Sequence, residues 1–199
     1  MATLGIRDLL DEVRRRPPFG DVRVVAVDGP SGSGKSTLAA RLATKANARL
    51  LWGDDFLSWP DFVDWWPRFQ QQVLEPLARQ QDARYQARDW QQDEFGTSLR
   101  DWKTLPWTPL VVVEGVTFAR SAAGARIAYR VWVEAPDDVR LVRGLERDGE
   151  SHRGLWLDWM SREREFFRQD RTRSRADVLV DGAPNEPRDP DHEVVVLEG

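Results

Sequence analysis

The spacing of apolar residues along the chain predicts several buried strands. Residues 22–28 (VRVVAVD) and 110–115 (LVVVEG) are nearly continuous β-branched runs. This pattern is typical of strands that are covered on both faces of a parallel sheet. Shorter runs at 48–53, 126–135 and 176–182 predict three more strands. The sequence therefore predicts a mostly parallel five-stranded sheet.

Helical segments separate these strands. Apolar residues recur at helical spacing in five stretches, one of which directly follows the glycine-rich loop after the first strand. The expected helices cover residues 4–15, 37–48, 67–80, 136–150 and 154–168. Strands that alternate with helices predict an α/β fold in which helices cover both sides of the sheet, a three-layer α/β/α sandwich. The tail, residues 192–199, is a candidate edge strand, and residues 185–191 (NEPRDPD) are expected to form a loop or hairpin connection.

The length of 199 residues fits a single domain, residues 1–199, because domains usually contain about 100 to 200 residues. The regular alternation covers residues 22–56 and 108–182, which we expect to form the core. Residues 57–107 interrupt it with a segment rich in Trp, Gln, Arg and Asp. We interpret this segment as a largely helical insertion that carries a binding surface.

Composition excludes several classes of protein. The formal net charge is -4, which disfavours a sequence-independent nucleic-acid binder, since such a protein needs a basic face. The chain has no Cys and two His, so any metal is expected to be a hard, oxygen-bound cation. No apolar run reaches the roughly 18 residues of a membrane span, and the first residues lack the pattern of a signal peptide. We expect a cytoplasmic protein without membrane or nucleic-acid partners.

A phosphate-binding motif follows the first buried strand. Residues 29–36, GPSGSGKS, match G-x-x-x-x-G-K-[ST] in full. Glycines allow backbone N–H groups to surround a polyphosphate, Lys35 neutralises its charge, and the Ser36 hydroxyl can bind Mg²⁺. The expected ATP-binding residues are Gly29, Ser31, Gly32, Ser33, Gly34, Lys35, Ser36 and Thr37. The motif predicts binding of a nucleoside triphosphate with Mg²⁺.

Carboxylates follow two other strands. Asp54 and Asp55 come after the strand at 48–53, and Glu114 ends the strand at 110–115. Carboxyl ends of parallel strands meet at one edge of a sheet, so these acids should lie near the phosphates. Phosphoryl transfer needs a carboxylate that orients or deprotonates the attacking hydroxyl, and a metal that bridges phosphate oxygens. Asp54 suits the base, Glu114 suits the metal site together with Ser36, and Asp55 suits an orienting or capping role.

The motifs GPSGSGKST, GDDF, VVVEG, RLVRGLERD and ADVLVDG occur in this order over about residues 22–182. This set resembles the uridine kinase family of P-loop kinases, whose relatives include nicotinamide riboside kinases and phosphoribulokinase. The resemblance implies that Asp54 is the general base and that Glu114 is associated with Mg²⁺. It also implies a mobile lid at 136–154. Leu57 stands where the family often has Tyr, so the resemblance does not carry a substrate assignment.

Three lid arginines, Arg140, Arg143 and Arg147, recur at spacings of three and four and so share one helix face. The resemblance implies that lid arginines contact the transferred phosphoryl group, and Arg143 and Arg147 are the first candidates. The alternative is a solvated face that pairs with neighbouring acids. His152 and His192 are expected to be surface residues.

The acceptor should bind to the insertion, which contains seven of the ten Trp residues together with Tyr85. Aromatic faces beside charged side chains suit a flat base or a sugar. The candidate acceptor-binding residues are Asp64, Trp65, Tyr85, Arg88 and Asp89. The alternative for each ring is that it packs the insertion against the core.

The expected function is an ATP-dependent phosphotransferase that moves the γ-phosphate to a hydroxyl of a nucleoside or nucleoside-like small molecule. One alternative is a kinase of a nucleoside monophosphate or of another small alcohol. Another is a non-catalytic protein that changes shape when it binds ATP. The pattern leaves open the identity of the acceptor, the choice between ATP and GTP, and the oligomeric state.

Overall fold

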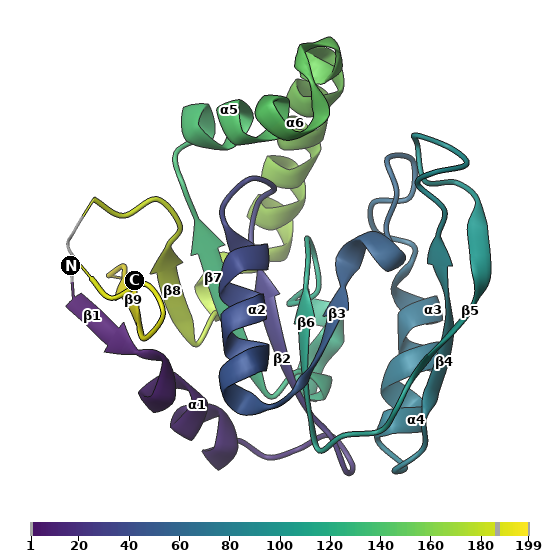
Figure 1. Ribbon diagram of the computed structural model, residues 1–199, viewed down its shortest axis with the longest axis vertical. Coiled ribbons are helices and arrows are strands. Elements are labelled where there is room, and N and C mark those ends of the chain that lie inside the picture. Colours follow the sequence, from purple (N-terminus) through teal and green to yellow (C-terminus); the bar gives the residue numbers. More distant parts are fainter. Residues whose placement is uncertain (1, 186–187, 199) are drawn as a thin grey trace.

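A computed structural model describes residues 2–185 and 188–198. It contains a seven-stranded sheet in the order β1-β9-β8-β7-β2-β6-β3 (Figure 1). The strands are β1 (Ala2–Gly5), β2 (Arg23–Asp28), β3 (Arg49–Trp52), β6 (Leu110–Glu114), β7 (Tyr129–Glu134), β8 (Val178–Asp181) and β9 (Glu193–Val196). The five predicted strands, β2, β3, β6, β7 and β8, are parallel to their neighbours. The two additional strands, β1 and β9, pair antiparallel at one edge.

The ends of the chain differ in detail from the sequence-based expectation. The tail forms β9, as expected, but it lies between β8 and β1 and is therefore not the outermost strand. The predicted helix at 4–15 begins later, as α1 (Ile6–Arg15), because residues 2–5 form β1. Of the connection expected at 185–191, positions 186–187 lie outside the described residues, and its other residues form no helix or strand.

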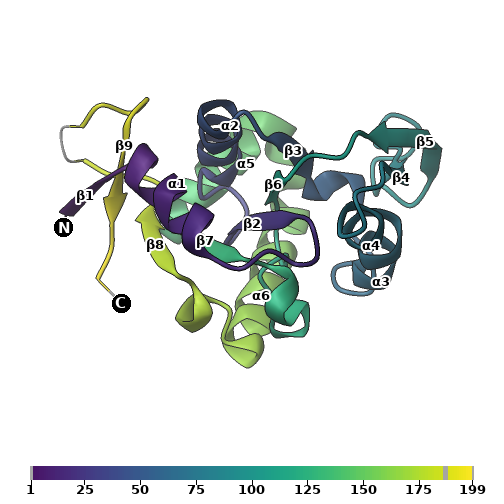
Figure 2. The same cartoon turned by 90° about the horizontal axis from the view of Figure 1, so that it is seen from below.

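Helices cover both faces of the sheet, as Figure 2 shows in the view from below. On one face, α1 and α2 (Lys35–Ala46) pack against Val25 and Val27 of β2. On the other face, α6 (Arg153–Asp170) packs against a cluster that includes Val24 and Ala26. Since side chains alternate along a strand, one apolar run supplies both layers. This arrangement confirms the three-layer α/β fold.

The insertion contains more than helix. Its first half consists of α3 (Trp66–Phe69), one wider turn at Gln70–Leu74, and α4 (Glu75–Leu77). Its second half is a two-stranded antiparallel hairpin of β4 (Ala83–Arg88) and β5 (Leu99–Leu105). The expectation of a largely helical insertion therefore holds for the first half only, and the hairpin was not expected. β5 is mostly exposed, so its sequence lacks the apolar alternation that would reveal a strand.

The predicted acids lie on neighbouring strands of the sheet. Strand β6 runs between β2 and β3, with Glu114 in register with Val27 on one side and Trp52 on the other. The phosphate loop leaves the end of β2, and a short 3-10 turn, Gly53–Asp55, leaves the end of β3. Helix α5 (Asp137–Asp148) follows β7 at the same edge of the sheet (Figure 1). In the described part of the chain, no helix is long and apolar enough to cross a bilayer.

Candidate active site

The predicted phosphate loop connects β2 to α2, and its shape requires glycine. Gly29 has a φ of 137°, and a Cβ there would collide with the Val133 carbonyl oxygen. Gly182, which follows β8, lies so close that a Cβ would collide with the Ser33 carbonyl oxygen. The Lys35 Nζ donates a hydrogen bond to the Pro30 carbonyl oxygen at 2.9 Å. The loop is therefore closed around its own lysine and tightly packed against β7 and β8.

The buried carboxylate of Asp28 holds the start of the phosphate loop through hydrogen bonds to backbone N–H groups. It accepts backbone N–H groups from Gly29 (2.6 Å), Thr117 (3.0 Å) and Ala119 (2.6 Å). Complete burial raises the pKa of Asp28 to about 6, while these hydrogen bonds and Lys35 act in the opposite direction. Sequence analysis did not select Asp28. The available signal was an acid at the end of an apolar strand, directly before a glycine.

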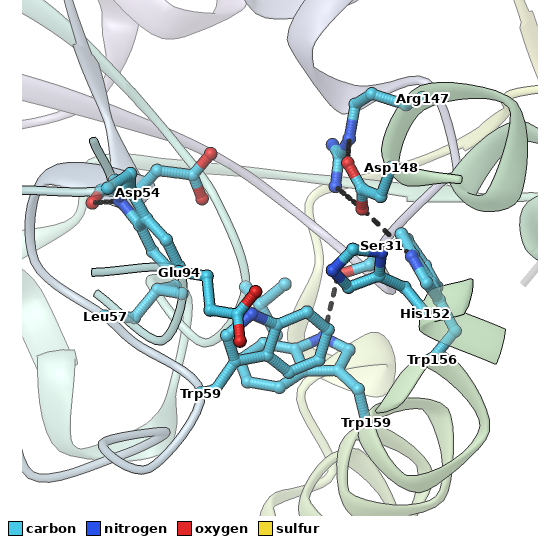
Figure 3. A pocket seen from close by; sticks show the side chains of 12 residues that line it. Ser31, Asp54, Leu57, Trp59, Glu94, Arg147, Asp148, His152, Trp156 and Trp159 are labelled. Carbon is cyan, nitrogen blue, oxygen red and sulfur yellow. Dashed lines mark hydrogen bonds and ion pairs between the residues drawn. The ribbon is translucent and has the colours of Figure 1, made fainter. Parts of the chain in front are cut away.

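Asp54 faces a cavity of about 440 Å³ at this edge of the sheet (Figure 3). The cavity joins the phosphate loop, the insertion and the α5–α6 region. Its lining residues are Ser31, Asp54, Leu57, Trp59, Trp90, Glu94, Val116, Arg147, Asp148, His152, Trp156 and Trp159. Asp54 is exposed to solvent in the cavity, and the protein around it still desolvates the carboxylate in part. This desolvation raises its pKa, against the opposing charges of Arg147 and Lys35, as expected of a candidate base.

Glu114 and Ser36 form the candidate metal site. Burial raises the pKa of Glu114 to about 7, and the Lys35 charge and the Ser36 hydroxyl oppose this shift. Within residues 2–185 and 188–198, no group of three or more His, Cys, Asp or Glu side chains could enclose a metal ion. A hydroxyl and one carboxylate beside a phosphate loop nevertheless fit Mg²⁺, which usually retains waters and takes further oxygens from substrate phosphates.

Arg140 is a structural residue of the loop rather than a free lid arginine. Its guanidinium donates to the Ser31 carbonyl oxygen (2.8 Å) and to Glu163 Oε2 (2.7 Å). The other Glu163 oxygen, Oε1, accepts the Ser31 N–H (2.8 Å) and the Trp159 indole N–H (2.7 Å). Arg140 and Glu163 are 5% and 1% exposed. We call this group of Ser31, Arg140, Trp159 and Glu163 the loop clamp.

The two arginines expected at the phosphoryl group border different cavities. Arg147 lines the Asp54 cavity and pairs with Asp148, through Nε to Oδ1 (2.7 Å) and Nη2 to Oδ2 (2.9 Å). Arg143 donates to the carbonyl oxygens of Gly32 and Gly182, both at 3.1 Å. It lines a second cavity of about 350 Å³, next to Gly34 and Thr37 of the loop.

None of the five predicted acceptor residues lines the Asp54 cavity. Trp65 is 1% exposed and packs among Phe56, Phe69 and Phe118. Asp64 is exposed to solvent. Trp65 is therefore a core residue, which is the alternative that we noted for each ring.

The other three candidates stabilise the insertion. The Tyr85 hydroxyl donates to Asp55 Oδ2 (2.9 Å), and Arg88 donates to the Phe56 carbonyl oxygen (2.8 Å). Asp89 pairs with Arg100 at 2.9 Å. Tyr85 and Arg88 thus hold the residues that directly follow Asp54 in the chain.

Sequence analysis missed most of the cavity wall. Trp156 and Trp159 come from α6, Glu94 comes from the β4–β5 connection, and His152 precedes α6. His152 was expected to be a surface residue, but it faces the cavity. Cavity lining depends on how the insertion and α6 face each other across the sheet edge, and the local sequence pattern holds no such information.

Comparisons with known proteins agree with this fold. A family profile described as AAA domain matches residues 25–168. A possible uridine kinase from Bacillus stearothermophilus superimposes with a TM-score of 0.63 at 18% identity, over 87% of this chain and 96% of that one.

A candidate fructose transport system kinase from Silicibacter sp. TM1040 superimposes with a TM-score of 0.59 at 20% identity, over 81% and 92% of the two chains. No curated protein matches in sequence. At these identities the two structures establish a shared fold. The family match spans well over half of the sequence, from β2 to α6, and the chain therefore belongs to the AAA domain family of P-loop proteins.

Proposed function

We propose that the protein is an ATP-dependent phosphotransferase that moves the γ-phosphate of ATP to a hydroxyl of a nucleoside or nucleoside-like small molecule. The observation that carries this proposal is the single cavity that joins Ser31 of the phosphate loop to Asp54 and Arg147. The two kinases of similar fold support a small-molecule acceptor. The second cavity, beside Gly34 and Thr37, offers space for the nucleoside part of ATP.

The proposed reaction begins with an acceptor hydroxyl beside Asp54. The hydroxyl oxygen attacks the γ-phosphorus, its proton passes to the Asp54 carboxylate, and the bond from the γ-phosphorus to the bridging oxygen breaks to release ADP. The raised pKa of Asp54 makes this carboxylate a better proton acceptor than an ordinary aspartate. The positive charges of Lys35 and Arg147 oppose that pKa shift, and they would stabilise charge on the transferred group.

Mg²⁺ would be held by Ser36 and Glu114. When bound, it neutralises phosphate charge and orients the phosphates for in-line transfer. Glu114 must be ionised to hold the ion, and its pKa of about 7 makes metal affinity sensitive to pH near neutrality.

Two alternatives are less well supported. A nucleoside monophosphate acceptor needs further cationic groups for its own phosphate, but the only Arg or Lys among the described cavity-lining residues is Arg147, which the proposed reaction already uses at the transferred group. A non-catalytic ATP-gated protein has no need for a desolvated carboxylate opposite the phosphate loop.

The test is ADP release with Mg²⁺-ATP against nucleosides, nucleoside monophosphates and small polyols. Asp54→Asn should lower turnover by about 10²–10⁴-fold, the usual contribution of a general base, while calorimetry shows unchanged ATP binding. Asp101→Asn, an exposed carboxylate on β5, is the matched control and should retain full activity. Full turnover by Asp54→Asn would remove Asp54 from the mechanism. Calorimetry showing no ATP binding by the unaltered protein would contradict the proposal.

A further inference from the structure

Four indole rings form the apolar walls of the Asp54 cavity. They belong to Trp59 and Trp90 of the insertion and to Trp156 and Trp159 of α6. Trp59 and Trp159 pack edge to face, with centroids 4.9 Å apart and an interplanar angle of 77°. Aromatic groups from two separate parts of the chain thus meet around the space next to the candidate base (Figure 3).

Three of the four indole N–H groups are already used inside the protein. Trp90 donates to the Asp54 carbonyl oxygen (2.8 Å) and Trp156 to Asp148 Oδ2 (3.0 Å). Trp159 donates to Ser31 Oγ (2.9 Å) and Glu163 Oε1 (2.7 Å). Trp156 and Trp159 are only 1% and 5% exposed, and the Arg147 guanidinium already lies 5.6 Å from the centre of the Trp156 ring. The partly exposed rings of Trp59 and Trp90 are therefore the ones that a ligand can reach.

The polar groups of the cavity are mostly anionic. Its lining contains three carboxylates, Asp54, Glu94 and Asp148, and one permanent cation, Arg147. Arg147 makes a two-point pair with Asp148, and Asp54 lies in the field of Arg147 and Lys35, so Glu94 is the cavity carboxylate with no such compensating charge described. In Figure 3, Glu94 lies beside Trp59 on the same side of the cavity as Asp54, whereas the Arg147–Asp148 pair lies across from them. Within the described parts of the chain, Glu94 forms no salt bridge.

Indole faces next to an unpaired carboxylate are suited to a cation. A positive charge over an aromatic face is attracted by the ring, and the attraction increases when water is excluded. Phosphates bound on the adjacent loop would add further negative charge, so an anionic acceptor would be repelled. A neutral acceptor of the same shape would gain contact with the rings but none of the charge attraction.

We propose that the acceptor carries a positive charge, on an aromatic or ammonium group held between Glu94 and the indole rings, and presents its hydroxyl to Asp54. This assignment rests on the proposed kinase function for the role of the hydroxyl. The preference for a cation is a binding property, however, and it can be measured without phosphoryl transfer.

The test uses two probes of matched shape, 1-(2-hydroxyethyl)pyridinium and 2-phenylethanol. Each has a six-membered aromatic ring and a primary hydroxyl, and only the first is charged. In calorimetry without ATP, the pyridinium probe should bind about tenfold more tightly, as expected for a cation beside indole and carboxylate. Glu94→Gln should remove most of this difference and leave the neutral probe unaffected. Asp101→Asn, the matched exposed carboxylate, should preserve it.

Several outcomes would overturn the proposal. They are equal affinity of the two probes, no measurable binding of either at millimolar concentration, and a cation preference that survives both Glu94→Gln and Trp59→Leu. ADP release is then measured with the same two probes. Turnover without preference for the cation would contradict this inference alone. A cation preference without turnover of any hydroxyl acceptor, including the nucleoside panel, would contradict the kinase function and leave the binding assignment in place.

Discussion

Glu163→Gln tests whether the loop clamp is an energetically important buried ion pair. Gln has the same shape and keeps one oxygen that can accept the N–H groups of Ser31 and Trp159. It removes the negative charge from the Arg140 guanidinium, which donates to Glu163 Oε2 at 2.7 Å. Removal of one partner from a buried pair usually costs about 3–5 kcal/mol, because the other charge stays buried.

The structure favours the lower end of this range. Arg140 also pairs with Asp137 at 2.7 Å, but the Asp137 side chain is 56% exposed and contributes a weaker, screened interaction. We therefore expect Glu163→Gln to lower the free energy of unfolding by about 3 kcal/mol. For a domain of this size, that corresponds to a fall in Tm of about 6–12 °C.

The matched control is Glu165→Gln on the same helix. Glu165 pairs with Arg168 at 2.7 Å, but the two side chains are 53% and 69% exposed, so solvent screens the pair and this change should leave the free energy of unfolding nearly unchanged. Urea unfolding, followed by tryptophan fluorescence, compares the two variants. Equal small losses in both would refute the reasoning that burial makes the clamp strong.

Three further results are expected. Lys35→Ala should weaken ATP binding by about 10–100-fold in calorimetry, because a charged hydrogen bond contributes about 1.5–3 kcal/mol; full ATP affinity would contradict the role of the lysine. The double variant Arg140→Met with Glu163→Leu should recover much of the stability lost in Glu163→Gln, yet raise the KM for ATP, since the backbone N–H and carbonyl oxygen of Ser31 lose their side-chain partners; an unchanged KM would show that the clamp does not shape the loop. Burial raises the pKa of Glu114 from 4.5 to about 7, so its unfavourable effect on folding is absent below about pH 4.5, grows as the pH rises from 4.5 to about 7, and is constant above that. Without Mg²⁺ and nucleotide, Glu114→Gln should therefore gain stability relative to the unaltered protein between pH 5.5 and 8 in urea unfolding, and a difference independent of pH would contradict the assignment.

Much of the core could be predicted because its information is local. A continuous β-branched run such as residues 22–28 can bury its side chains on both faces only in the middle of a parallel sheet that helices cover on both sides. The glycine motif after it determines its own backbone shape. Since the carboxyl ends of parallel strands share an edge, the approach of Asp54 and Glu114 to the loop followed from strand order alone.

The lining of the Asp54 cavity could not be predicted because its residues come from separate segments. Trp65 and Trp159 have the same chemistry, yet Trp65 packs inside the core and Trp159 lines the cavity. Whether an indole ring lines the cavity depends on how its segment packs at the edge of the sheet. The composition of the insertion does not determine that packing. Likewise, Tyr85 was expected to contact a ligand, but its hydroxyl is held by Asp55.

Two residues of the insertion, Trp90 and Arg88, hold the turn that carries Asp54, and the first of them also lines the cavity. Trp90 lines the cavity with its ring and holds the Asp54 carbonyl oxygen with its N–H, while Arg88 holds the carbonyl oxygen of Phe56. A substitution at Trp90 that reshapes the cavity wall would therefore also release the turn that carries Asp54. By contrast, Glu94 lines the cavity and forms no salt bridge among the described residues. Changes of acceptor preference should thus be reached more easily through Glu94 than through Trp90, because only the first leaves the base in place.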